Sequence, residues 1–258
     1  MIIDSHVHIG DWDYEWYSYN NGNDPILLYN WVDMAVFIPT DMKQNSELLQ
    51  TLRLTMKRDT WFFIPWFDPK DVLSESTFRF IEKNIAGIHG LKVHSSIDKI
   101  PCGISNNIYK PLLNLARSFD LPLLVHCGRW QEMAGWKYLV EVAERHPDLK
   151  FIGAHLGGDR EDLKIVAPRA VKERGLQNVW FDISATREWW TIGMAIEQIG
   201  IERIIFGSDY PVMHPLMSIA SVKALGLTED EEKRVFSENI LAVLKDVLPN
   251  TIVAGNPV

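Results

Sequence analysis

IIDSHVHIG, residues 2–10, joins an apolar run to two histidines and a glycine, a pattern typical of a β-strand that ends at a functional loop. Side chains at positions i and i+2 of a strand point the same way, so His6 and His8 could face one ion from a single strand end. An isolated His-x-His could equally be an ordinary buried pair. The other apolar runs of the chain favour the first interpretation.

Three further apolar runs end in a residue of the same chemical kind. They are LPLLVHCG (121–128) with His126, FIGAHLGG (151–158) with His155, and IIFGSDYP (204–211) with Asp209. Histidine and aspartate bind metal ions and move protons. Core packing alone does not explain this repeated placement, so the sequence predicts a metal site where the strands end.

Short β-rich runs alternate with longer amphipathic runs along the chain, which predicts an α/β fold. Eight strands and eight crossovers fit a (β/α)8 TIM barrel, with residues 1–258 as a single domain, and place all five residues on its C-terminal face. A doubly wound sheet would alternate similarly, but residues 11–24 lack its glycine-rich fingerprint. The expected strands span residues 2–8, 34–39, 61–67, 88–94, 121–126, 150–155, 178–184 and 203–208, and the expected helices 45–59, 76–84, 107–119, 135–146, 163–175, 191–200 and 228–248.

Composition favours a small-molecule partner. The net charge is −8 and the 258 residues contain no basic run, which argues against nucleic acid and against an anionic membrane surface. No apolar stretch is long enough to span a bilayer. The cysteines are Cys102 and Cys127, and an expected strand at Ile2 leaves no room for a signal peptide, so we expect a reduced, cytoplasmic location. A homo-oligomer is left open.

With these landmarks, the chain resembles the amidohydrolase superfamily, and most closely the branch that contains aminocarboxymuconate semialdehyde decarboxylase. The resemblance covers essentially the whole chain, from the first strand to the eighth. It implies that His6, His8 and His126 are metal ligands, that His155 is a ligand or a proton-transfer group, and that Asp209 is the carboxylate of the eighth strand.

Such a donor set suits one divalent ion, above all Zn²⁺, with an open position for a water whose pKa falls from about 15.7 to about 7. Asp209 could take the proton of that water and deliver it to a leaving group. His155 could donate a hydrogen bond to the developing oxyanion. Asp209 could also cap a helix that begins in SDYP, residues 208–211.

In the fourth expected strand, HGLKVHS (89–95), His94 points into the barrel if Lys92 does, because the two residues are two positions apart. In relatives such as dihydroorotase, a lysine on this strand is carboxylated and bridges two metals, so a second ion on Lys92 is an open alternative. We favour an uncarboxylated Lys92 that orients a substrate carboxylate or pairs with Asp209, and hence one metal. His94 could contact substrate or cap the following loop.

The loops after the strands suggest a cyclic or aromatic substrate. Arg129 and Arg187 could grip its carboxylate, although most loop arginines are solvated or paired. Cys127 should point toward the helices and fill the core. Aromatic residues could form pocket walls, or equally seal the barrel or build a subunit interface; they are Trp12, Tyr14, Trp16, Tyr17, Tyr19, Trp130, Trp136, Trp189 and Trp190.

The leading functional prediction is a divalent-metal hydrolase acting on an amide, lactone or related carbonyl bond of a small cyclic or aromatic molecule. The alternative is a nonhydrolytic decarboxylase of an aromatic or unsaturated carboxylic acid. A metal-independent lactonase is also known in this superfamily. A catalytically silent barrel that serves as a binding protein is disfavoured, because all five candidate residues are intact.

Overall fold

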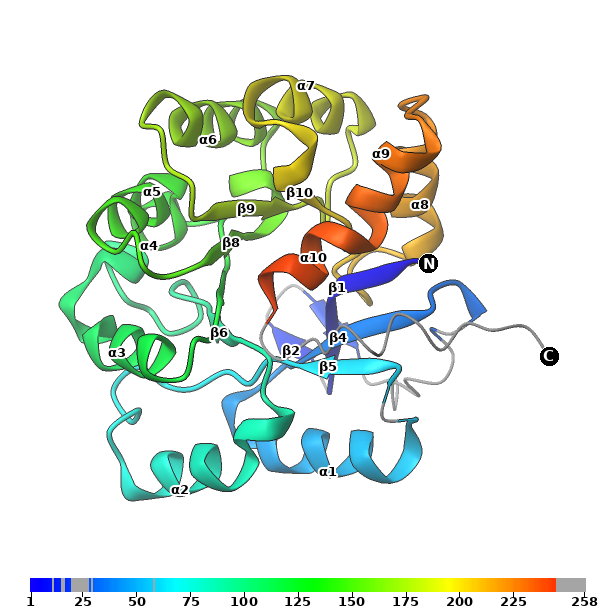
Figure 1. The fold of residues 1–258 in the computed structure, drawn as a ribbon. Helices are drawn as coiled ribbons and strands as arrows, with labels where there is room; N and C mark the ends of the chain where they lie inside the picture. Colours follow the sequence, from blue (N-terminus) through cyan, green and yellow to red (C-terminus); the bar gives the residue numbers. More distant parts are fainter. Residues whose placement is uncertain (11, 15–16, 20–27, 29, 58, 245–258) are drawn as a thin grey trace.

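The computed structural model describes residues 1–10, 12–14, 17–19, 28, 30–57 and 59–244. Figure 1 shows a ring of strands surrounded by helices. The ring consists of a three-stranded sheet in the order β1-β4-β5 and a five-stranded sheet in the order β10-β9-β8-β7-β6, with parallel pairings throughout. The strands are β1 Ile3–Ile9, β4 Met34–Pro39, β5 Trp61–Phe63, β6 Leu91–Val93, β7 Leu123–Val125, β8 Phe151–Gly153, β9 Val179–Asp182 and β10 Ile204–Ile205.

Backbone hydrogen bonds join the two sheets along both of their edges. On the β5–β6 side, the His89 amide donates to the Phe63 carbonyl at 2.9 Å. Where β10 meets β1, the Ser5 amide donates to the Phe206 carbonyl at 3.1 Å. The strand order therefore runs once around a closed ring, and the α/β TIM-barrel fold predicted from the sequence is confirmed. The extent of the domain over residues 1–258 stays a prediction.

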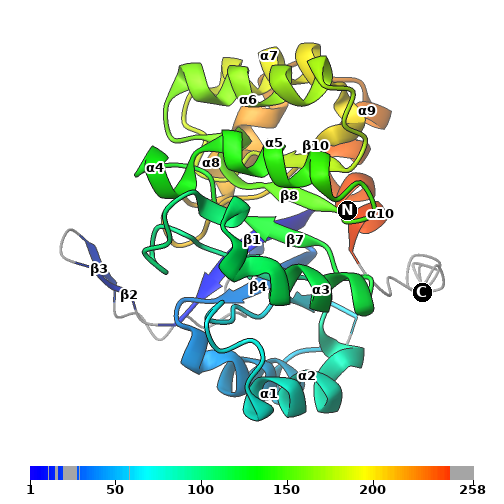
Figure 2. The ribbon, with the colours of Figure 1, turned by 90° about the vertical axis from the view of Figure 1, so that its left-hand side faces the viewer.

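Helices form the outer layer (Figures 1 and 2). In α1 the buried leucines Leu48, Leu49 and Leu52 recur at helical spacing, so one face packs on the strands. A π-helical turn at Arg234–Glu238 joins α9 to α10. No helix in the described part of the chain is long and apolar enough to cross a membrane. The helices are α1 Asn45–Thr55, α2 Glu75–Asn84, α3 Lys110–Ser118, α4 Gln131–Ala134, α5 Trp136–Arg145, α6 Glu161–Glu173, α7 Trp189–Ile199, α8 Pro215–Lys223, α9 Glu229–Lys233 and α10 Asn239–Val243.

An apolar cluster fills the inside of the ring. Its members from the strands include Ile3, Val36 and Ile152, and α10 adds Ile240 and Val243. In Figure 2, α10 lies beside the N-terminus, at the end of the barrel where the strands begin. That end is closed by side chains, so polar chemistry is confined to the opposite end.

Several elements differ from the sequence prediction. β10 has two residues where six were expected, because the chain leaves the sheet after Ile205 to form the loop that carries Asp209. Helix α8 was not predicted, since its apolar residues do not follow one face. Asp209 as a helix cap is wrong: α8 begins at Pro215, and the His214 ring accepts from the Leu216 amide at 3.2 Å.

A second unpredicted feature is the antiparallel hairpin of β2 (Trp12–Tyr14) and β3 (Tyr17–Tyr19). It projects from the barrel beyond the end of β1 (Figure 2). The aromatic cluster predicted for this loop falls on the hairpin and on Trp16, which lies outside the described residues, as does the tail 245–258. A pocket wall from these aromatic side chains stays a prediction.

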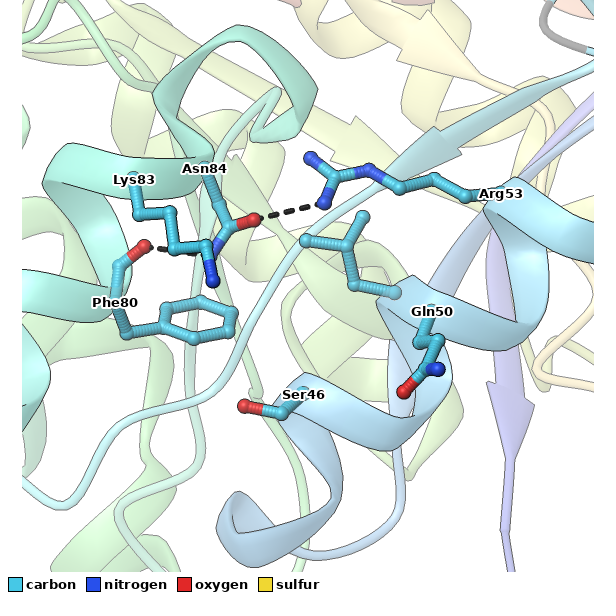
Figure 3. A pocket seen from close by; sticks show the side chains of 7 residues that line it. Ser46, Gln50, Arg53, Phe80, Lys83 and Asn84 are labelled. Carbon is cyan, nitrogen blue, oxygen red and sulfur yellow. Dashed lines mark hydrogen bonds between the residues drawn. The ribbon is translucent and has the colours of Figure 1, made fainter.

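A cavity of about 350 Å³ lies between α1 and α2, and Figure 3 shows the side chains that line it. The Arg53 guanidinium donates to the Asn84 side-chain oxygen at 2.8 Å, and the Asn84 amide donates to the Phe80 carbonyl at 2.8 Å. The first bond ties α1 to α2 on the outside of the barrel, and the second holds the Asn84 side chain against its own helix. The cavity belongs to the helix layer and does not contain the residues predicted for the site.

Candidate active site

The first strand bends so that both of its histidines face the barrel interior. The pairing of β1 with β4 shifts between Asp4 and Val7, as expected for a β-bulge. Regular alternation would place Ile3 and Val7 on one face, but Ile3 packs in the interior cluster and Val7 in the layer under the helices. The shift lets His6 and His8 point inward above Ile3, and both are at most 5% exposed.

His6, His8 and Asp209 converge on one point. The two Nε2 atoms are 3.2 Å apart, and Asp209 Oδ1 lies 3.5 Å from His6 Nε2 and 3.3 Å from His8 Nε2. Tetrahedral Zn²⁺ with bonds of about 2.0–2.1 Å separates its ligand atoms by about 3.3 Å. The three donors thus fit three corners of such a site.

A second group of potential ligands, His6 with His155 and Asp182, fits an ion less well. His6 Nδ1 lies 2.9 Å from Asp182 Oδ2, which is a hydrogen-bond distance. The other carboxylate oxygen accepts from the His155 amide at 2.9 Å and from the Ser184 amide at 3.1 Å. This second group is therefore a hydrogen-bonded support for the first.

Asp182 and Ser184 were not among the predicted site residues. Both are completely buried, and Asp182 ends β9. A carboxylate that accepts from a ligating histidine fixes its tautomer and orientation. The signal was present in the sequence, because VWFDIS (179–184) is one more apolar run that ends in an acid.

Lys92 reaches the same centre from β6. Its side chain is 1% exposed, and Nζ lies 3.0 Å from His6 Nε2. Burial lowers the pKa of Lys92 to about 8, against the attraction of Asp209 and Asp182 for the charged form. The lysine therefore faces the inside of the barrel as predicted, with His6 as its hydrogen-bond partner.

The charge states of the group suit a metal centre. Burial, followed by the field of Lys92, lowers the pKa of His6 to about 4, so its ring is neutral near pH 7. Burial alone would raise the pKa of Asp209, but the hydrogen bond from His8 and the neighbouring imidazoles hold it well below its usual range. Neutral imidazoles and an ionised carboxylate are the forms that bind a metal ion.

His155, His126 and His94 form a second set of rings beside this centre. His155 Nε2 lies 3.2 Å from His126 Nδ1, and the rings of His126 and His94 stack with centroids 3.8 Å apart. The structure brings His126 next to His155, but not into either group of converging ligand atoms. Its ligand role, and the choice between ligand and proton carrier for His155, stay predictions.

Two loops of the site hold residues in the left-handed region. His155 has φ of 59° and Asp209 has φ of 67°. Such backbone costs about 1–3 kcal/mol for each non-glycine residue and persists where surrounding bonds enforce it. The Asp209 amide donates to the His6 carbonyl at 2.8 Å, and the His155 amide donates to Asp182. These bonds hold both functional side chains at the strand ends.

The other predicted residues lie on loops or in the layer under the helices. Arg129 and Arg187 are exposed. Cys127 is buried in the layer under the helices, as predicted, and burial raises the pKa of its thiol to about 12. Trp130, Trp189 and Trp190 are each 45–46% exposed. A substrate-gripping role for the two arginines stays a prediction.

Solved structures with the same fold include enzymes of two reaction types. An amidohydrolase from Burkholderia multivorans with bound zinc is 15% identical, covers 94% of this chain and 98% of its own, and superposes with a TM-score of 0.72. A probable 2-pyrone-4,6-dicarboxylic acid hydrolase from Acinetobacter baumannii with bound citric acid is also 15% identical, with the same coverage of both chains and a TM-score of 0.70. 5-Carboxyvanillate decarboxylase from Sphingomonas paucimobilis is 15% identical, with the same coverage of both chains and a TM-score of 0.68.

At these identities the solved structures establish the fold alone. No curated protein sequence matches the chain. The family model described as Amidohydrolase matches residues 3–245, which span every strand of the barrel and all of the site residues described above. The chain therefore belongs to the amidohydrolase family.

Proposed function

We propose that this chain is a divalent-metal hydrolase acting on an amide, lactone or related carbonyl bond of a small cyclic or aromatic molecule. The observation that carries the proposal is the convergence of His6, His8 and Asp209 at 3.2–3.5 Å, the spacing of ligands around one ion. The family resemblance adds His126 as a further ligand. Zn²⁺ is the ion that this donor set suits best.

A divalent ion held there would supply Lewis acidity and lower the pKa of water toward about 7. Asp209 is ionised at neutral pH, so its carboxylate can accept the proton of the attacking water and return it to the leaving group. In the metal-free protein Lys92 Nζ lies 3.0 Å from His6 Nε2; with an ion bound to that nitrogen, the Lys92 ammonium can instead donate to a carbonyl or carboxylate oxygen of the substrate. The apolar barrel interior below excludes bulk water from these groups.

His155 takes a supporting part in this proposal. Its Nδ1 lies 2.8 Å from Ser184 Oγ and 3.1 Å from the Ser184 carbonyl, and its Nε2 faces His126. Both ring nitrogens thus have protein partners. His94 is less buried than His155, and it is the ring better placed to meet a substrate at the mouth.

One observation favours decarboxylation as the second candidate. Lys92 is a buried cation next to the ligand group, and a substrate carboxylate would be its natural partner. In that reaction the acid group at the centre would protonate the ring carbon as carbon dioxide leaves. The names of several structural neighbours include decarboxylases of aromatic acids.

A panel of lactones, amides and aromatic acids separates the two reactions, because lactone hydrolysis releases a proton, amide hydrolysis an amine, and decarboxylation carbon dioxide. We expect turnover of a lactone or amide without carbon dioxide. Asp209→Asn should lower kcat by at least about 10²-fold as a lost proton carrier. The control Asp148→Asn, in an exposed ion pair with Arg117, should leave kcat unchanged. Carbon dioxide release from the acids alone would instead establish the decarboxylase.

A further inference from the structure

One hydroxyl group connects the two sets of histidines. Ser184 Oγ lies 2.8 Å from His155 Nδ1 and 3.1 Å from His6 Nδ1, and it donates its own hydrogen to Asp182 Oδ1. Ser184 is completely buried, so water does not compete for these positions. The three hydrogen bonds meet at a single oxygen atom.

Counting hydrogens settles the direction of each bond. Asp182 Oδ1 accepts from the backbone amides of His155 and Ser184, and Asp182 Oδ2 faces His6 Nδ1 at 2.9 Å, so both carboxylate oxygens act as acceptors. The single hydrogen of Ser184 is donated to Asp182, and its oxygen can then only accept from the imidazoles. Both Nδ1 atoms must therefore carry hydrogen.

We propose that Asp182 and Ser184 are positioning residues that hold His6 and His155 in the Nδ1–H tautomer. The Nε2 lone pair of His6 then points to His8 and Asp209, where a metal ligand is needed. The Nε2 lone pair of His155 points to His126 Nδ1 at 3.2 Å, so His126 must donate there.

The chain of bonds thus reaches a third histidine. With its Nδ1 hydrogen donated to His155, the neutral His126 ring keeps a lone pair on Nε2. One carboxylate at the end of β9 therefore sets the tautomers of His6, His155 and His126. The metal-facing part of this inference rests on the proposed function, whereas the tautomers themselves do not.

The test is a long-range ¹⁵N–¹H spectrum of the metal-free protein labelled at histidine nitrogens, with signals assigned from His→Gln variants. In the wild type we expect His6, His155 and His126 to carry hydrogen on Nδ1. Ser184→Ala leaves His155 Nδ1 with only the backbone carbonyl of residue 184 at 3.1 Å, so the share of His155 in the Nδ1–H form should fall, while His6 keeps Nδ1–H through Asp182. The control Ser118→Ala, on the exposed face of α3, should change none of these signals.

A second readout concerns affinity. Asp182→Asn should weaken Zn²⁺ binding about 10–100-fold in a chelator competition, as loss of a partner of a metal-ligating histidine does. A wild-type spectrum with His155 in the Nε2–H form, or one that Ser184→Ala does not alter, would overturn the proposal. Absence of metal binding with the expected tautomers would refute the proposed function and leave this inference standing.

Discussion

The buried carboxylate of Asp4 is compensated by three hydrogen bonds. Asp4 is completely buried, and it accepts from the Ser208 hydroxyl at 2.6 Å, the Ser208 amide at 2.9 Å and the His6 amide at 3.2 Å. These bonds tie the bulged part of β1 to the residue that precedes Asp209. The geometry of the ligand group thus depends on a carboxylate that does not itself belong to it.

Lys92 provides the first prediction at the scale of a residue. Because it is the buried cation beside the ligand group, Lys92→Met should weaken binding of a benzoate-like acid by about 1.5–3 kcal/mol, the value of a hydrogen bond to a charged group. Arg129→Met and Arg187→Met, at exposed positions, serve as matched comparisons and should reduce the binding free energy of the acid by less. Titration calorimetry measures this, and metal content should be the same in all three variants. A larger loss of binding free energy for either arginine variant than for Lys92→Met would indicate that the substrate carboxylate binds at the loops.

Sequence reasoning found the residues that stand at strand ends and could not find how they pair. His6, His8 and Asp209 were recognised because metal-ligating residue types recur after apolar runs. The contact between His155 and His126 depends on the left-handed backbone conformation at His155. A histidine in the sequence does not predict that conformation. Asp182 was missed although it follows the same pattern.

At the scale of elements, the predicted helices that are confirmed include several with a strong 3.6-residue period, such as α2, α3 and α5. The strands were placed correctly; β1 and β4 have the expected length, and the others are shorter, because the chain turns into loops near their ends. The helix expected over 228–248 is interrupted by a π-helical turn at Arg234–Glu238.

Helix α10 provides the prediction at this scale. Ile240 is 1% exposed and packs in the interior cluster, so Ile240→Ala should lower the free energy of unfolding by about 2–5 kcal/mol. Leu241→Ala, at a half-buried neighbouring position, is the matched control and should cost less. Urea denaturation measures both. Metal content should not change, because the cluster lies at the closed end of the barrel. Equal losses of unfolding free energy in the two variants would argue that α10 does not close this end of the barrel.

At the scale of the whole molecule, Asp98 is one of the acids that link stability to pH. Asp98 accepts from the Tyr109 hydroxyl at 2.6 Å, and burial raises the pKa of Asp98 from 3.8 to about 7. The folded protein then holds a proton that the unfolded chain has lost, so the contribution of Asp98 is full below its unfolded pKa and is lost as pH rises through about 7.

Asp98→Asn should remove this dependence. Between about pH 5 and about pH 8, the free energy of unfolding of the metal-free wild type should fall more steeply with pH than that of the variant. Urea denaturation at several pH values, with a chelator present, measures the difference between the two proteins. Equal slopes, or a steeper fall in the variant, would show that Asp98 is not protonated in the folded state.

The barrel explains why fold and family were predictable while the reaction is not. Eight parallel strands bring their C-terminal ends together whatever the substrate, and neighbours that are 14–15% identical share this arrangement with hydrolase and decarboxylase names alike. The fold therefore does not decide which of these reactions the chain catalyses.

The central claim is that His6, His8 and Asp209 hold one divalent ion for hydrolysis. Elemental analysis of the purified protein, alongside the double variant His6→Ala with His8→Ala, tests it most directly. We predict close to one equivalent of a divalent metal, Zn²⁺ above all, in the wild type and none in the variant. Two equivalents would indicate a carboxylated Lys92 that bridges a second ion. A metal-free wild type that retains full activity would contradict the claim.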